Sequence, residues 1–194
     1  MMDKFKQFIL GVSPQLSLTS LELLRKITVL KEYKVKDNLY EFGKIPTKFY
    51  ILISGITKSY TILDNGNEYV NRLHNKGEVM GPLTALIENS EANFGIECIT
   101  DCDILECTYQ DFIHLSESDL NFGIFHRKYL ELLYVSYTQR IKEFLSLSGV
   151  ERYLKLRKRI PGIDTLVSQK LIASHLAITP IQLSRIRNKL KSKV

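Results

Sequence analysis

Apolar residues follow a strand-like pattern in one part of this chain and a helical pattern in the others. From residue 29 to residue 107, short apolar or alternating runs are separated by turn residues at close intervals, a pattern typical of a β-sandwich or barrel. The run at 49–53 predicts a buried strand, and residues 56–63 alternate with period two up to the Asp-Asn-Gly-Asn turn at 64–67. Because Asn and Gly both tolerate positive φ, this turn predicts a hairpin in which residues 69–74 return antiparallel.

Helical periods flank the predicted strands. A capping-box sequence from Thr19 to Glu22 predicts a short helix near the start of the chain, and Thr108 to Asp111 predicts a second helix start. Within 121–148, apolar residues recur at three- and four-residue intervals, which predicts one helix of about 42 Å. These apolar residues are Phe125, Tyr129, Leu130, Leu133, Tyr137, Ile141 and Phe144.

A helix of this length extends beyond a barrel of this size. We therefore expect one face of 121–148 to pack on the barrel and another to pack on a second subunit, as in a coiled-coil-like homodimer. The alternative is a single long amphipathic helix on a monomer.

Three shorter helical segments are predicted after residue 148. The first ends at Pro161-Gly162, where proline and glycine stop a helix. Ser168 is placed to N-cap the second, at 169–176. The third begins at 179–182 with a capping box and with proline at the first helical position, where its missing N–H costs nothing.

The last two segments have the spacing of a helix-turn-helix motif. Counted from Gln169, small residues lie at the fifth and ninth positions, Ala173 and Ala177. Apolar residues occupy the positions where the motif packs, namely Ile172, Leu176, Ile178, Leu183 and Ile186. Such packing leaves the outer face of the second helix free for a DNA major groove. The ninth position is usually a left-handed glycine, so we expect Ala177 to cost on the order of 1 kcal/mol.

Positive charge is concentrated in the last part of the chain. The formal net charge is +6, but residues 151–194 hold eleven basic and two acidic side chains, whereas the other 150 residues hold 16 and 19. A basic end of this kind suggests a nucleic-acid or anionic-membrane surface, because it gains affinity by releasing condensed counterions. A solvated basic helix is the alternative.

Composition excludes several classes of protein. The chain has 194 residues, 44% of them hydrophobic and 25% charged, as expected for one large or two small globular domains. Its longest uncharged run, residues 7–21, contains Gly11 and Pro14 and is too short for a membrane span. The N-terminus lacks the pattern of a secretory signal. We expect a cytoplasmic protein without a membrane partner.

Cysteine and histidine give no pattern of a metal or catalytic site. Cys98, Cys102 and Cys107 are expected to be buried thiols, because an odd, closely spaced set does not suggest a disulfide framework. The histidines at 74, 114, 126 and 175 are scattered and form neither a zinc set nor the His-x-His pair of cupin enzymes. His74 or His126 could still serve as a lone haem ligand. The sequence therefore predicts no metal site and no enzymatic activity.

In this order, the motifs resemble the Crp/Fnr family of bacterial transcription regulators over nearly the whole chain. The matching barrel segments are 39–43, 50–55, 64–67, 76–78 with Gly81, and 101–105, and the segment 179–187 is similar to the recognition helix of the family.

The resemblance implies an α+β fold in three parts. Residues 1–118 would form an antiparallel β jelly-roll barrel of the cyclic-nucleotide-binding type with an N-terminal helix, and 119–148 a long dimerisation helix. Residues 149–194 would form an all-α helix-turn-helix domain without an obvious wing. The implied protein is a homodimer that binds a roughly two-fold symmetric site in double-stranded DNA and regulates transcription, with RNA polymerase as a further candidate partner. A ligand-binding or protein-interaction module whose basic tail binds no specific DNA is the alternative.

The same resemblance assigns DNA contacts to the helix at 179–190 and its surroundings. Arg185 matches the base-reading arginine of the family, whose fork can donate two hydrogen bonds to guanine. Ser168 and Thr179 match positions where hydroxyls and helix N-termini meet phosphate. The further candidates are Gln182, Ser184 and Asn188 on the same outward side, and Gln169, Lys170, Arg187, Lys189 and Lys191 as phosphate or solvent contacts.

Two positions argue against a cyclic nucleotide in the barrel. Relatives that respond to one carry a glutamate just after a glycine and an arginine about ten residues later, but here Pro82 follows Gly81 and the arginine position falls at Ala92 or Asn93. A buried phosphate without a charge-assisted partner is costly, so we expect no cyclic nucleotide. The candidate pocket for another, unknown small-molecule effector is Gly81, Pro82, Leu83, Thr84, Asn89, Ser90 and Asn93, which also suit a polar loop.

Overall fold

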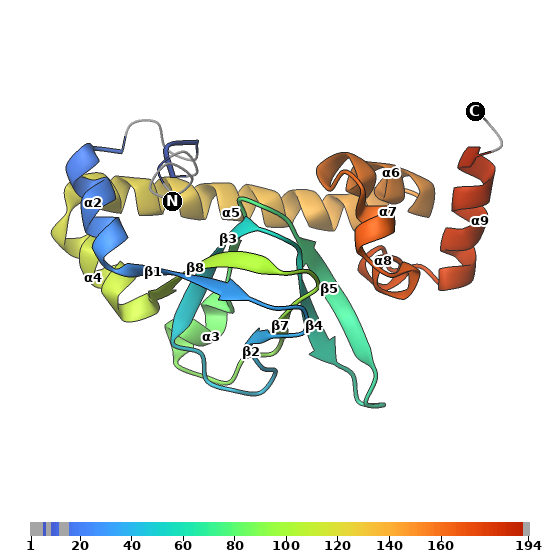
Figure 1. Cartoon of the computed structure of the whole chain (residues 1–194), viewed down its shortest axis with the longest axis horizontal. Helices are drawn as coiled ribbons and strands as arrows, with labels where there is room; N and C mark the ends of the chain where they lie inside the picture. Colours follow the sequence, from blue (N-terminus) through green and yellow to red (C-terminus); the bar gives the residue numbers. More distant parts are fainter. Residues whose placement is uncertain (1–5, 7–8, 12–15, 192–194) are drawn as a thin grey trace.

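The computed structural model describes residue 6, residues 9–11 and residues 16–191. It consists of an antiparallel β domain, a long helix that runs beside it, and a group of C-terminal helices at the far end of that helix (Figure 1). The predicted α+β class, with antiparallel sheets followed by an all-helical region, is confirmed.

Eight strands in the described part of the chain form two four-stranded sheets, with orders β1-β8-β3-β6 and β2-β7-β4-β5. All pairs are antiparallel. The predicted hairpin is confirmed, because β4 and β5 pair from Thr57↔His74 to Ile62↔Glu68 across the turn. The strands are β1 Thr28–Tyr33, β2 Asn38–Tyr40, β3 Lys48–Ser54, β4 Thr57–Ile62, β5 Glu68–His74, β6 Val79–Met80, β7 Gly95–Cys98 and β8 Cys102–Thr108.

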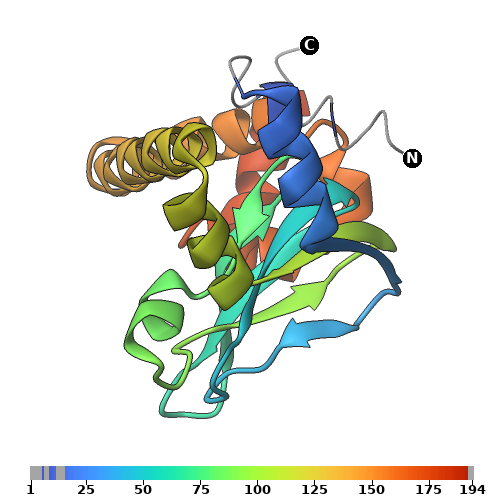
Figure 2. The same ribbon diagram turned by 90° about the vertical axis from the view of Figure 1, so that its left-hand side faces the viewer.

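Helices precede, interrupt and follow the strands. Figure 2 looks almost along α5 and shows it outside the sheets, next to α4. The C-terminal group comprises α6 to α9. The helices are α2 Leu18–Lys26, α3 Leu83–Glu88, α4 Tyr109–Ser118, α5 Leu120–Ser146, α6 Gly149–Arg159, α7 Ile163–Leu166, α8 Gln169–His175 and α9 Pro180–Lys191.

Two apolar cores hold the β domain together. One lies between the two sheets and includes Leu52 and Ile104, which are fully buried. The other joins one sheet to α2, α4 and α5, and includes Phe49 and Phe122. Strand β3 contributes to both cores, which explains why 49–53 is apolar without alternation. The three cysteines are buried free thiols, as predicted.

Side-chain caps fix where the helices begin. Helix α4 is capped by Thr108, which accepts a hydrogen bond from the Asp111 amide, as predicted. The predicted cap at Thr19 is wrong, because Ser17 caps α2 by accepting from the Ser20 amide and Thr19 lies inside the helix. The Ser20 hydroxyl donates to Asp119 at 2.7 Å, and Asp119 also caps α5, so one carboxylate ties α2 to the start of the long helix.

Helix α5 has 27 residues, close to the predicted range of 121–148. Its first turns are anchored in the helical core by Phe122 and Phe125, and the Phe122 ring lies 5.0 Å from that of Phe112. Its last turns reach the C-terminal helices (Figure 1). The long helix therefore connects the β domain to the C-terminal domain.

The C-terminal helices pack around Tyr153, Leu156 and Ile172. The same apolar cluster includes Val70 and Leu73 of β5, so it continues into the β domain. Besides the three predicted helices, the C-terminal domain contains the short helix α7, which follows Gly162 at φ +75° and buries Ile163.

Candidate nucleic-acid interface and effector pocket

Helices α8 and α9 have the geometry of a helix-turn-helix. Ser168 caps α8 by accepting from the Leu171 amide, as predicted. Ala173 of α8 and Leu183 of α9 are both completely buried where the two helices meet. Ala177, in the turn, has φ +52°, which is the left-handed conformation expected at this position.

We expect Ala177→Gly to raise the free energy of unfolding by about 0.5–1 kcal/mol, because glycine removes the left-handed strain but adds freedom to the unfolded chain. Urea denaturation measures the change. Ala173→Gly is the matched control, which should instead destabilise, because Ala173 is helical and buried. Destabilisation by Ala177→Gly would contradict the assigned strain.

The predicted capping box at the start of α9 is confirmed. The Thr179 amide donates to Gln182 Oε1 at 2.8 Å, and the Gln182 amide donates to Thr179 Oγ1 at 3.1 Å. Gln169 reaches over from α8 and donates from Nε2 to the Pro180 carbonyl at 2.7 Å. Three of the candidate DNA contacts thus also hold α9 in place.

Arg187 differs from the expected phosphate or solvent contact. Its Nη2 lies 2.5 Å from Asp164 Oδ1, and its Nε donates to the Tyr153 hydroxyl at 3.2 Å. One turn after Leu183, Arg187 faces the domain rather than the outer side of α9. It therefore ties α9 to α6 and α7 in this structure.

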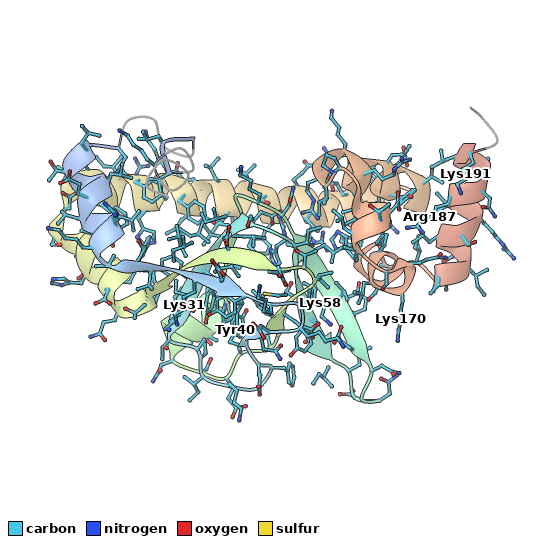
Figure 3. The ribbon with its side chains drawn as sticks, in the orientation of Figure 1. Lys31, Tyr40, Lys58, Lys170, Arg187 and Lys191 are labelled. Atoms are coloured by element: carbon cyan, nitrogen blue, oxygen red, sulfur yellow. The ribbon has the colours of Figure 1, made fainter. Side chains whose placement is uncertain are left out.

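The outer side of α9 carries exposed polar side chains at i, i+3 and i+6, which are Gln182, Arg185 and Asn188. Arg185 has no hydrogen bond or ion pair with any residue that the structure describes. Ser184 is half-buried. Lys170 of α8 and Lys189 and Lys191 of α9 are exposed, and Figure 3 labels Lys170, Arg187 and Lys191 on these helices.

The candidate effector residues surround α3. Gly81 and Leu83 line a small cavity of about 100 Å³ between α3, β6 and α5, whose other walls include Phe112, Tyr129 and Leu133. This cavity does not include Thr84, Asn89, Ser90 or Asn93 in its lining, and Pro82 caps α3 without a side-chain hydrogen bond.

The cavity beside α3 is apolar. Its lining, within the described residues, contains no lysine or arginine, and burial lowers the pKa of its His126. Ala92, where the cassette arginine would stand, is buried, and its amide donates to the Lys44 carbonyl. The polar residues expected to line this site and the cavity itself are therefore largely separate.

A contact between the two domains was missed by sequence reasoning. Helix α8 lies on β5, where the Val70 amide donates to Ser174 Oγ at 2.8 Å. Arg159, at the end of α6, donates to the Leu73 carbonyl at 2.9 Å, and the Asn75 amide group donates to the Arg159 carbonyl. Neither periodicity nor any motif indicates these pairings.

Neither a metal-binding cluster nor a membrane-spanning helix is found among the described residues. No group of three or more His, Cys, Asp and Glu side chains among them could hold a metal ion. No helix among them is long and apolar enough to cross a membrane.

Comparison with known proteins identifies the β domain first. Residues 30–119 match the family model of the cyclic nucleotide-binding domain. The fold, from this domain through the long helix to the C-terminal helices, is shared with the solved structures of FixK2 and of a catabolite activator protein. A search of curated proteins finds none that is significantly similar in sequence.

Individual structures share this fold at low sequence identity. FixK2 from Bradyrhizobium japonicum is 16% identical with a TM-score of 0.70, over 86% of each chain. A putative cyclic nucleotide binding protein from Ruegeria pomeroyi is 19% identical with a TM-score of 0.71, over 98% of this chain and 88% of that one. The catabolite activator protein of Thermus thermophilus is 17% identical with a TM-score of 0.55, over 94% and 87%.

Proposed function

We propose that this protein is a dimeric transcription regulator of the Crp/Fnr type that reads double-stranded DNA with α9. The observation that carries the proposal is the exposed face of Gln182, Arg185 and Asn188 on the second helix of a helix-turn-helix. Arg185, which has no hydrogen bond or ion pair with the described residues, can enter a major groove without losing a contact, whereas the Gln182 side chain also caps α9.

The charge of the C-terminal domain supports binding to the DNA backbone. Lys170 of α8 and Lys189 and Lys191 of α9 are exposed and would contact phosphates. The hydroxyls of Ser168 and Thr179 lie at the N-termini of α8 and α9, where free N–H groups favour anions. In this proposal the protein acts in the cytoplasm, and RNA polymerase is its downstream partner.

The dimer part of the proposal rests on an apolar stripe along α5. Exposed apolar side chains recur at intervals of four, three, four and four residues and so share one face. Their exposed fractions run from 39% to 83%, which is unusual for large apolar groups along one helix. The stripe consists of Leu130, Tyr134, Tyr137, Ile141 and Leu145.

We expect Arg185→Ala to weaken binding to the preferred site by about 1–3 kcal/mol and to relax the preference at one guanine position. Selection from a randomised DNA library measures both effects. The control is Lys170→Ala, which should weaken all sequences alike and lower the salt slope by about one. An equal loss across all sequences for Arg185→Ala would instead make Arg185 a phosphate contact.

A further inference from the structure

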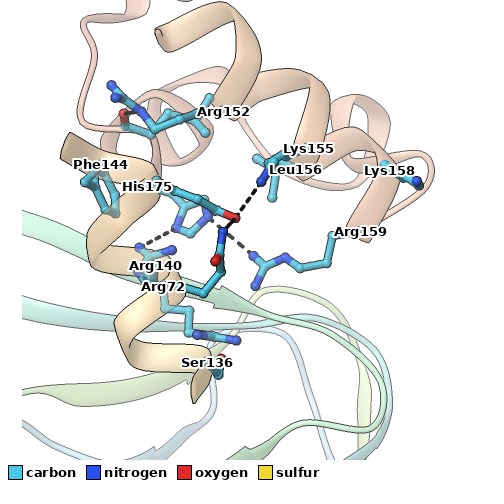
Figure 4. Close-up of a pocket in the computed structure, with 13 residues that line it drawn as sticks. Arg72, Ser136, Arg140, Phe144, Arg152, Lys155, Leu156, Lys158, Arg159 and His175 are labelled. Carbon is cyan, nitrogen blue, oxygen red and sulfur yellow. Dashed lines mark hydrogen bonds and ion pairs between the residues drawn. The ribbon is translucent and has the colours of Figure 1, made fainter. Parts of the chain in front are cut away.

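A larger cavity, of about 500 Å³, lies at the junction of the two domains. Helices α5, α6 and α8 and strand β5 all contribute side chains to it, and Figure 4 shows Arg140, Arg159 and His175 meeting inside it. This volume is within the range of small-molecule sites, about 300–1,000 Å³. The cavity is lined by different residues from the apolar one beside α3.

Positive charge dominates the lining of this junction cavity. Of the carboxylates near it, Glu143 pairs with Lys155 at 2.8 Å, and Glu78 lies 2.8 Å from Arg72 and 3.5 Å from Arg159. Six cationic side chains therefore face two carboxylates. The six are Arg72, Arg140, Arg152, Lys155, Lys158 and Arg159.

Two arginines of the cavity, Arg140 and Arg152, form no ion pair with a carboxylate of the described residues and are held by neutral groups. Arg140 donates to the Asn71 carbonyl, and Arg152 donates to the carbonyls of Leu147 and Leu176 at 2.7 and 3.1 Å. Both guanidinium groups lie over the Phe144 ring, at 4.8 and 5.3 Å. Carbonyl oxygens and a ring orient these side chains but supply no opposite charge. The carboxylate whose charge acts on Arg140 is that of Glu143, which is itself paired with Lys155.

His175 does not offset the excess of positive charge in the cavity. It is buried, its Nδ1 lies 3.4 Å from Arg140 Nη2, and its Nε2 lies 3.4 Å from Arg159 Nη2. Burial and these two arginines hold the pKa of His175 well below its usual range, so the ring is neutral. A neutral imidazole has one acceptor nitrogen, so only one of the two arginines can donate to it. The Nη2 of the other arginine then keeps only its hydrogen bond to a backbone carbonyl, which is that of Asn71 for Arg140 and that of Leu73 for Arg159.

Burial and repulsion within the cluster also lower the pKa of one of its arginines. Burial, together with the charges of Arg72 and Arg159, lowers the pKa of Arg140 to about 10. An anion placed among these groups would remove that repulsion, since opposite charge favours the charged form of each arginine.

We propose that the junction cavity binds a small organic phosphate that carries at least two negative charges. Guanidinium forks match phosphate oxygens, and several separated cations favour several charges on the ligand. Phe144, Leu156 and Leu176 in the lining provide apolar surface for an organic part. Because β5, α5, α6 and α8 would all contact the ligand, it would hold the two domains in one arrangement. The proposal does not depend on DNA binding.

The test is calorimetric titration of the full-length protein with ATP in buffer containing EDTA, with pyrophosphate as a smaller probe and adenosine as an uncharged one. The first variant, Arg140→Gln, removes the central cation. The second, Lys155→Gln/Lys158→Gln, removes two rim cations that hold no backbone group. The matched control, Arg157→Gln/Lys170→Gln, removes two cations of the same domain that do not line the cavity. Circular dichroism and thermal unfolding verify that each variant is folded.

We expect ATP to bind, adenosine not to bind, and each cavity variant to weaken ATP binding about tenfold or more while the control does not. If Arg140→Gln fails to fold, the double lysine variant decides. The proposal is overturned if neither ATP nor pyrophosphate binds, if adenosine binds as tightly as ATP, or if the cavity variants bind ATP like the control. It is also overturned if they lose affinity only for a non-specific DNA duplex, because the cations would then belong to the DNA-binding surface.

Discussion

Replacing Ile141 with aspartate is expected to convert the proposed dimer into a monomer and to weaken binding to a two-fold symmetric DNA site by about 100-fold or more. Ile141 lies in the middle of the apolar stripe on α5 and is 60% exposed in the single chain. A carboxylate there would be buried without a partner when two helices pack. Each remaining monomer would reach only one half-site. Sedimentation velocity and DNA titration measure the two effects.

Val135→Asp is the matched control for the dimer, because Val135 is also 60% exposed and apolar but lies off the stripe. It should leave both the sedimentation coefficient and the DNA affinity close to those of the unchanged protein. A dimeric Ile141→Asp variant, or equal dissociation of the two variants, would contradict dimerisation through this face of α5.

The second large effect concerns the anchor of the long helix. Phe122→Ala is expected to lower the free energy of unfolding by about 3–5 kcal/mol. The Phe122 ring is completely buried and lies 5.0 Å from Phe112 and 5.4 Å from Phe125, so truncation leaves a cavity where α4 and α5 meet. Denaturant unfolding at one fixed protein concentration measures the loss, because a dimer is stabilised by mass action.

Phe42→Ala makes the same change at a position that is 37% exposed and belongs to no helix or strand. It should cost about 1 kcal/mol or less. A similar loss at both positions would mean that the aromatic cluster does not anchor α5.

Local signals were sufficient for much of the fold. Alternation and the turn at 64–67 predicted the β4-β5 hairpin, and the helical period predicted α5 to within two residues at each end. The helix-turn-helix spacing even predicted the left-handed Ala177. These features depend on neighbours in sequence, which is why periodicity and turn chemistry could identify them.

The exact start of a helix depends on which of several neighbouring polar residues caps it. Ser17 caps α2 although Thr19 begins a matching pattern, and Ser148 with Glu151 forms a capping box that opens α6. The second of these has the S-x-x-E spacing and could have been found in the sequence.

Long-range pairings could not be predicted from one sequence. Arg187 contacts Asp164, and Arg159 contacts the β5 backbone, only because the domains fold as they do. The junction cavity has the same origin, since its cations come from residue 72 and from residues 140 to 159. Periodicity assigns each residue to a face of its own element but does not say which other element will meet that face.

The central claim is that α9 reads specific DNA, and binding of the purified protein to promoter fragments of its own genome at several salt concentrations tests it most directly. We predict a site-selective complex whose log affinity falls linearly with log salt, with a slope of about 0.9 for each phosphate contacted. A complex without site preference, or no salt-sensitive complex, would contradict the claim. It would favour a ligand-binding or protein-interaction module with a basic end instead.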